Sequence, residues 1–108
     1  MSAVLPTKSD EITSYNPATG EEAGRVAVTS PEEVADVVIR AREAFGEWRK
    51  TTFNERKRLV MRVREVILAD IDGIAKLTSA ESGKPFGEAI SMEIAPVLDL
   101  MQYFARNT

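Results

Sequence analysis

The fold is decided first by the stretch SPEEVADVVIRAREAFG, which is residues 30–46. Ser30 is a preferred helix-capping residue, Pro31 suits the first helical position, and Glu33 stands where a capping box needs an acid. Glu32 and Glu33 also lie next to the positive end of the helix dipole. Apolar residues then recur at helical spacing until Gly46 ends the run. This pattern predicts an amphipathic helix whose apolar stripe consists of Val34, Val37, Val38, Ala41, Ala44 and Phe45.

Two more helices are predicted directly downstream. The connector that leads to them holds Trp48, which we expect to fill a gap between helices. The second helix begins near Thr52 and runs to about Asp70, because apolar residues recur there at helical spacing. The third is capped by Asp70 or Asp72 and is stopped by Gly83, since glycine is the favoured residue just past a helix end.

The fourth predicted helix begins at Phe86 and has two features that do not suit a self-contained bundle. Pro96 stands in its middle, where it removes an amide donor, collides with the carbonyl of Met92 and costs about 3 kcal/mol. We therefore expect a kink that some other feature compensates. The helix also reaches Thr108 without a glycine stop, so the chain is expected to be cut from a longer protein. Its apolar stripe consists of Phe86, Ile90, Ile94, Val97, Leu98, Met101 and Phe104.

The residues before the first helix predict a small β-hairpin. Residues 12–15 are β-prone, 16–20 are the turn-forming run Asn-Pro-Ala-Thr-Gly, and 23–28 alternate loosely. A lone hairpin is only marginally stable, so it must lie against other elements. Residues 1–11 are expected to form a flexible N-terminus. The predicted fold class is mainly α, with about four helices and an N-terminal β-hairpin in residues 12–108.

The composition excludes several classes of function. The 108 residues contain no Cys and no His, which rules out a disulfide framework, a cysteine nucleophile and the usual zinc ligands. The net charge of −3 argues against a nucleic-acid partner, and acids interrupt the basic cluster at 49–64, which is typical of a solvated helix face. No apolar run approaches the roughly 18 residues of a membrane span, so we expect no membrane partner and a soluble, cytoplasmic protein.

The common phosphate- and dinucleotide-binding motifs are not found. Gly83 and Lys84 invite a phosphate-loop interpretation, but Pro85 follows the lysine and Thr78 stands where that motif needs glycine. There is no G-x-G-x-x-G fingerprint. Pairs of glutamates lie at turns or helix starts, where capping and charge explain them. The residues alone therefore indicate a helical domain of unknown role.

Several segments, taken in order, resemble one family. The turn YNPATGE (15–21) is followed by a helix that ends in AREAF (41–45), then by ESGKP (81–85) and by a helix that ends in YFA (103–105). This ordered set is similar to the N-terminal part of NAD(P)-dependent aldehyde dehydrogenases, and it covers about residues 12–105. The resemblance implies that the hairpin and helices are part of the α/β fold of those enzymes, as a layer on the cofactor-binding domain.

The resemblance also implies what this chain lacks. In that family a cysteine attacks the aldehyde, hydride passes to the nicotinamide of NAD or NADP, and a glutamate-activated water hydrolyses the thioester. The residues concerned follow the stretch that corresponds to this chain, so no catalytic or cofactor-binding residue is assigned here. The chain is then an inactive N-terminal fragment of a homo-oligomeric enzyme that oxidises an aldehyde to a carboxylic acid. The alternative is a free-standing helical protein-interaction module without catalysis.

Some members of the family hold a potassium or sodium ion close to the segments that match here. The resemblance assigns the backbone ligands to Ser14 and Tyr15 and the carboxylate ligand to Glu81, with a third ligand downstream. Hard cations prefer oxygen ligands, so the ligand types fit. Glu81 is one methylene longer than the Asp often found at this position. The alternative is that Glu81 is an ordinary polar residue near a helix end.

The resemblance further implies a wall of the aldehyde tunnel. Met92 and Pro96 lie four apart and so share one face of the last helix. In aldehyde dehydrogenases the matching positions border the substrate tunnel. Apolar, uncharged walls would suit a hydrophobic or neutral aldehyde. The alternative is that Met92 fills the core and that Pro96 only interrupts a helix.

Overall fold

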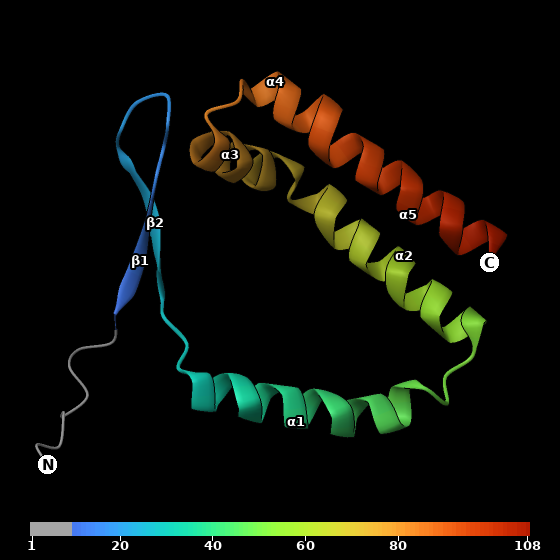
Figure 1. The fold of residues 1–108 in the computed structure, drawn as a ribbon. Helices are drawn as coiled ribbons and strands as arrows, with labels where there is room; N and C mark the ends of the chain where they lie inside the picture. Colours follow the sequence, from blue (N-terminus) through green and yellow to red (C-terminus); the bar gives the residue numbers. More distant parts are fainter. Residues whose placement is uncertain (1–9) are drawn as a thin grey trace, which may run out of the picture.

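The computed structural model describes residues 10–108, a hairpin followed by helices (Figure 1). Residues 1–9, most of the segment expected to be flexible, lie outside the described residues. The elements are β1 (Glu11–Tyr15), β2 (Glu22–Ala27), α1 (Pro31–Trp48), α2 (Phe53–Ala69), α3 (Ile71–Ser82), α4 (Phe86–Glu88), the π-helix η1 (Ala89–Ile94) and α5 (Ala95–Asn107). Because α4, η1 and α5 run on as one rod, the prediction of four helical segments and a hairpin is confirmed.

The hairpin is antiparallel and closes through the predicted turn. Ile12 pairs with Val26, and the register shifts between Ser14 and Tyr15. Within the turn, the Gly20 amide donates to the Asn16 carbonyl over 2.7 Å. Gly20 has a φ of 75°, which a residue with a side chain rarely adopts.

The starts of α1 and α2 are fixed by two capping boxes of the same kind. The Glu33 amide donates to the Ser30 hydroxyl over 3.2 Å, and the Ser30 amide donates to the Glu33 carboxylate over 2.8 Å. Thr52 and Glu55 repeat this exchange at the start of α2. Each box satisfies amides that the first helical turn would otherwise leave free.

The predicted end of the first helix was wrong. α1 continues past Gly46 to Trp48, and the Arg49 amide still donates to the Phe45 carbonyl over 2.9 Å. A glycine ends a helix when it takes a left-handed φ, and Gly46 does not. Gly83 does, with a φ of 72°, and it ends α3 as expected. Asp70 occupies the cap position of α3, but its side chain makes no capping hydrogen bond.

The compensation expected around Pro96 is a π-helix. The Ala95 amide donates to the Ile90 carbonyl, five residues back, at the end of η1. Pro96 therefore lies in the first turn of α5, directly after the π-turn, and the rod continues through it. The extra residue of the π-turn takes up the irregularity that the proline imposes on the rod.

A small core holds α3, η1 and α5 together. The buried residues of the described chain are Ala75, Ala89, Ile94 and Leu98. Partly buried side chains surround them, and α2 lies side by side with α5 (Figure 1). The partly buried residues are Ile67, Ile71, Ile74, Ile90 and Met101.

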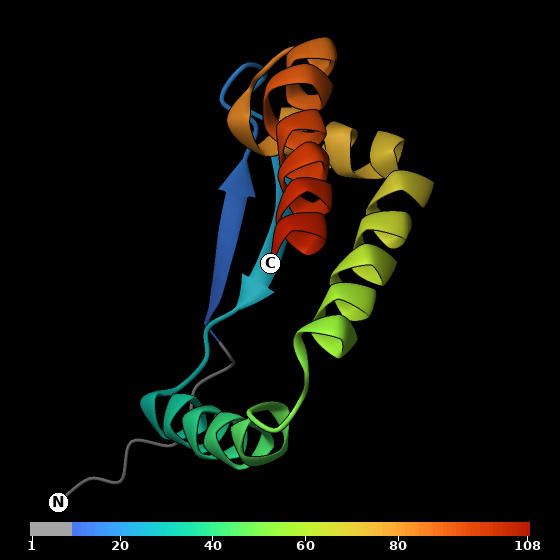
Figure 2. The same ribbon diagram turned by 90° about the vertical axis from the view of Figure 1, so that its right-hand side faces the viewer.

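Helix α1 stands apart from this core (Figure 2). Within residues 10–108 it contains no buried residue, and the contact it makes with another helix is at its last residue, where Arg56 of α2 donates to the Trp48 carbonyl over 3.1 Å. The radius of gyration is 19.1 Å, whereas a compact domain of this length has about 13 Å. The expectation that Trp48 fills a gap between helices was therefore wrong. Its ring is 42% exposed and is faced by the Arg56 guanidinium 5.1 Å from its centre.

Candidate functional site

The loop after α3 lies against the turn of the hairpin. A Cβ added to Gly83 would stand 2.8 Å from Cγ of Pro17 and 3.4 Å from the backbone nitrogen of Ala18. Helix α3 also contacts both strands. The Asn-Pro turn and the Gly-Lys-Pro loop, which are far apart in the sequence, therefore form one close contact.

Hydrogen bonds fix this loop on both sides of Lys84. The Ser79 hydroxyl donates to the Lys84 carbonyl, and the Lys84 amide donates to the Ser82 hydroxyl over 3.3 Å. The Lys84 ammonium forms an ion pair with the Glu93 carboxylate in η1. The lysine thus ties the loop to the helix that follows it.

The three residues predicted for a cation site lie on neighbouring elements. Ser14 and Tyr15 are in β1 at the register shift, where backbone groups leave the regular ladder. Glu81 is exposed near the end of α3, which contacts β1. Within residues 10–108, no cluster of three or more acidic side chains is present that could hold a metal ion. A cation here would therefore depend on backbone oxygens.

The two residues predicted for the tunnel are both exposed. Met92 is 70% exposed in η1, whereas Ala89 and Ile94 of the same π-helix are buried. The inner side of η1 thus faces the core while Met92 points away from it. Pro96 is exposed one turn further along. Met92 is thus outside the small core that Ala75, Ala89, Ile94 and Leu98 form within residues 10–108.

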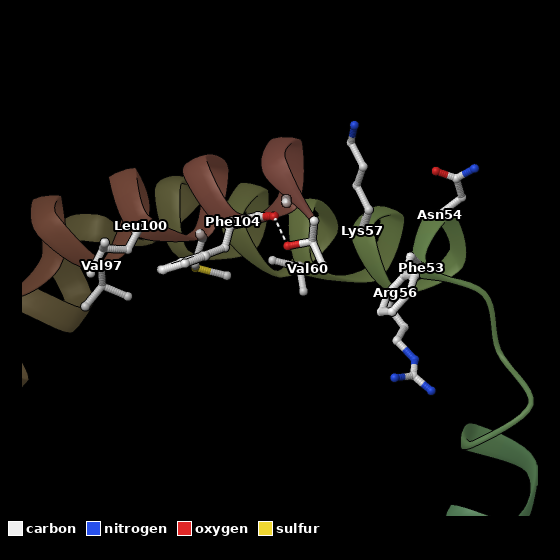
Figure 3. A pocket seen from close by; sticks show the side chains of 11 residues that line it. Phe53, Asn54, Arg56, Lys57, Val60, Val97, Leu100 and Phe104 are labelled. Atoms are coloured by element: carbon white, nitrogen blue, oxygen red, sulfur yellow. Dashed lines mark hydrogen bonds between the residues drawn. The ribbon is translucent and has the colours of Figure 1, made fainter.

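An apolar groove that the sequence analysis did not single out runs between α2 and α5. It has a volume of about 480 Å³. Val60 of α2 and Val97, Leu100 and Phe104 of α5 lie along it, while Lys57 and Arg56 point away to opposite sides (Figure 3). The apolar stripe of the last helix could have indicated this groove, because the stripe extends beyond the residues that pack in the core.

Two polar contacts of the last helix also escaped sequence reasoning. Arg64 of α2 donates from Nε to the Leu98 carbonyl over 3.1 Å and so joins α2 to α5. The Lys84 to Glu93 ion pair spans a loop and a π-turn. Neither pair has the three- or four-residue spacing by which ion pairs within a helix are recognised.

Three carboxyls have a lowered pKa, and each has a structural cause. A hydrogen bond from Arg25 lowers the pKa of Glu22 in the hairpin. The backbone amides of Ser30 and Thr52 lower the pKa of Glu33 and Glu55 respectively at the capping boxes. The hydrogen bonds that cause these pKa shifts stabilise the hairpin and the helix starts. They do not indicate an acid or base prepared for catalysis.

No helix in residues 10–108 has the length and apolar character that crossing a membrane requires. The described residues thus provide three surface features: the exposed side of the rod at Met92 and Pro96, the loop fixed around Lys84, and the apolar groove between α2 and α5. These features can shape the surroundings of a small molecule or dock polypeptide.

Comparison with known proteins gives consistent results. A sequence model described as "Aldehyde dehydrogenase family" matches residues 4–108. "Malonate-semialdehyde dehydrogenase 2" of Bacillus mycoides is 39% identical over 74 residues, which are 68% of this chain and 15% of the relative. "Malonate-semialdehyde dehydrogenase 3" of Geobacillus kaustophilus is 37% identical over 86 residues, 80% of this chain and 18% of the relative. The chain thus spans less than a fifth of these relatives.

Proposed function

The chain belongs to the aldehyde dehydrogenase family, and we propose that it is the N-terminal segment of an enzyme that oxidises an aldehyde to a carboxylic acid with NAD or NADP. The observation that carries the proposal is the family match over residues 4–108. Residues 12–108 would form the hairpin and helical layer on the cofactor-binding domain. We further propose that the parent enzyme is a cytoplasmic homo-oligomer.

The chemical steps would be performed by residues outside this chain. The chain has no cysteine to form a thiohemiacetal. Its residues also do not fit a dinucleotide, because no glycine-rich turn opens a helix that could receive the phosphates. We therefore assign none of its residues to the cofactor and predict that the 108-residue chain alone is inactive.

The role left to this chain is to shape the path of the aldehyde. Met92 and Pro96 would form one wall of the tunnel, and their exposure on the same rod supports this role because neither side chain is covered by residues 10–108. A flexible methionine can adapt to aldehydes of more than one shape. The fixed Lys84 loop would hold the start of this wall in place.

Replacing Met92 tests the tunnel directly in the full-length enzyme. We expect Met92→Trp to raise KM for bulky aldehydes far more than for acetaldehyde, with KM for the cofactor unchanged, because a narrowed tunnel affects only what passes through it. Leu77→Trp is the matched control, since Leu77 is an exposed apolar residue of α3 outside the proposed wall. Equal changes for small and large aldehydes would remove Met92 from the tunnel.

We also propose that Ser14, Tyr15 and Glu81 contribute to a potassium or sodium site. The contact between β1 and α3 supports this, since it brings the two segments together. Crystals of the full-length enzyme soaked in thallium or rubidium should show an anomalous peak beside Glu81. The peak should disappear in Glu81→Gln, and a native crystal without a peak there would contradict the site.

Two classes of aldehyde are candidates for the substrate. The relatives are named for malonate semialdehyde, which carries a carboxylate. The wall proposed at Met92 and Pro96 is apolar and instead suits an uncharged aldehyde.

A further inference from the structure

The buried residues of the rod formed by α4, η1 and α5 have a spacing that an α-helix does not produce. Ala89, Ile94 and Leu98 belong to one core cluster. Ile94 and Leu98 are four apart, so an α-helix brings them to the same face. Ala89 and Ile94 are five apart, and residues five apart in an α-helix differ in direction by about 140°. Both reach the core because η1 lies between them, where hydrogen bonds extend back over five residues.

The π-helix η1 thus contains one residue more than an α-helix would need between these two core positions. Pro96 does not account for this residue, because a proline interrupts a helix without lengthening it. The Ala95 amide donates to the Ile90 carbonyl, and Pro96 has no amide. The Ser91 carbonyl is therefore left without its usual helical donor. An expansion that gives up a helical hydrogen bond in this way is frequently found at functional sites.

The additional residue has to be accommodated on the outer side of the rod. Ala89 and Ile94 hold both ends of the π-turn in the core, so the backbone between them can only widen away from it. Residues 91–93 are all exposed, and Met92 in the middle of them is 70% exposed. The expansion therefore displaces Met92 outward.

Ser91 is the residue of this outer turn that can be removed with the least loss of other contacts. Its hydroxyl donates to the Gly87 carbonyl over 2.9 Å, one turn back in the same rod. Glu93, by contrast, is paired with Lys84 in the loop before the rod. Removing Ser91 would leave a spacing of four between the core positions of η1, which an ordinary α-helix brings to one face.

We infer that Ser91 is a positioning residue: as the additional residue of η1 it displaces Met92 outward and thereby narrows the path of the aldehyde. The inference rests on the proposed function, which places Met92 in the wall of that path. The π-turn then limits the size of the aldehyde that passes, and the core would pack without it.

Deletion of Ser91 tests this in the full-length enzyme. Pro96→Ala is the common background, because Pro96 in an unbroken α-helix would collide with the Met92 carbonyl. Compared with Pro96→Ala alone, the added deletion should lower KM for bulky aldehydes about fivefold relative to KM for acetaldehyde, with KM for the cofactor unchanged. This direction is opposite to that expected for Met92→Trp, because here Met92 withdraws from the path.

Two further variants in the same background separate the position of Met92 from other effects. Ser91→Ala removes the hydroxyl but keeps the number of residues, so it should change the ratio of the two KM values far less than the deletion does. Once Met92→Ala is present, the deletion should no longer change this ratio, because both substitutions act through the same side chain.

Crystal structures and urea unfolding of the full-length variants report on the turn itself. Pro96→Ala should keep the π-turn, whereas the deletion variant should have a continuous α-helix with Ala89 and Ile94 still buried. Its unfolding midpoint should equal or exceed that of Pro96→Ala, because the core is retained and the Ser91 carbonyl is no longer in the helix.

The outcomes distinguish this inference from the proposed function. A deletion variant that is less stable or does not fold would show that packing needs the additional residue, and loss of the π-turn in Pro96→Ala would assign the turn to the proline. Either result would overturn the inference, as would a KM ratio that the deletion leaves unchanged, and the function would stand. A full-length protein that oxidises no aldehyde would overturn the function, and the inference with it.

Discussion

Glu33 and Glu55 show how single residues start the helices of this chain. Each accepts hydrogen bonds from its capping residue, mainly from the backbone amide, and these bonds lower its pKa from an ordinary value of 4.5. Since the carboxylate form is the one favoured in the helix, the stabilisation is present above the unfolded pKa. It is lost as the pH falls through the lowered folded pKa.

Acidification should therefore loosen the first turn of α1 and of α2 before the rest of these helices. We expect amide hydrogen exchange in these turns, corrected for its intrinsic pH dependence, to quicken as the pH falls below about 4.5. Glu33→Gln should remove the pH dependence in α1 and leave it in α2, where Glu55 is the internal control. A pH dependence in α1 that survives this substitution would exclude the capping box as its cause.

At the scale of an element, the end of α3 depends on a glycine for two reasons. Gly83 has a φ of 72°, and a Cβ there would approach Cγ of Pro17 to 2.8 Å. The first property is typical of a helix C-cap, while the second arises only because the hairpin turn packs on this loop. The glycine thus joins the local end of a helix to a long-range contact.

Gly83→Ala should lower the free energy of unfolding by about 1–2 kcal/mol from the left-handed backbone alone, and further from the contact with Pro17. Gly87→Ala is the matched control, because Gly87 has open space at its Cβ position and an ordinary φ, so alanine there should be neutral or stabilising. Urea unfolding of the two variants measures the difference. Equal unfolding midpoints would show that the loop does not need a glycine.

The elements that could be predicted are those whose signals are local. The start of α1 was predicted from Ser30 and Glu33, the turn of the hairpin from Asn16 to Gly20, and the end of α3 from Gly83. An irregularity around Pro96 was predicted, but its form, a π-helix over Ala89–Ile94, was not, because a proline does not itself determine which turn of the helix takes up the extra residue. The continuation of α1 past Gly46 was not predicted. A glycine ends a helix only when its φ is positive, and the sequence alone does not show which φ a glycine adopts.

For the candidate site, the sequence and its resemblance to the family named single residues but not the contacts between them. They singled out Met92, which the structure finds exposed, and Glu81, on a helix that contacts β1. The pairing of Lys84 with Glu93 was not foreseen, because the loop and the π-turn between them set the distance.

At the scale of the whole molecule, the apolar surface exceeds what this chain buries. Among residues 10–108, large apolar side chains are exposed on every long helix, including the stripe of α1. Contiguous apolar surface of this kind marks a place where other polypeptide packs. The extended shape, 59 × 44 × 17 Å, has the same implication because little of the chain lies in an interior.

The isolated 108-residue chain should therefore associate with itself. We expect its average mass by light scattering to rise with concentration, because exposed stripes of separate copies can cover one another. Phe45→Glu, within the α1 stripe, should weaken this association, whereas Ala35→Glu, outside the stripe, should not. A monodisperse monomer with a sharp, cooperative thermal transition would contradict the expectation and favour a free-standing module.

The proposed identity as an enzyme segment also predicts the size of the natural protein. The relatives are more than four times the length of this chain, since the 74 and 86 matched residues are only 15% and 18% of them. The intact mass of the protein purified from its source should accordingly be far above 11.9 kDa. A stable natural product of 11.9 kDa would favour the interaction module.

The most direct test of the account is to measure NADH or NADPH formation from an aldehyde by two proteins in one assay, the full-length enzyme and the 108-residue chain. The account predicts aldehyde-dependent formation by the full-length enzyme and none by the chain alone, because the chain has no cysteine nucleophile and no dinucleotide grip. Formation by the isolated chain, or no formation by the full-length protein with any aldehyde, would contradict it.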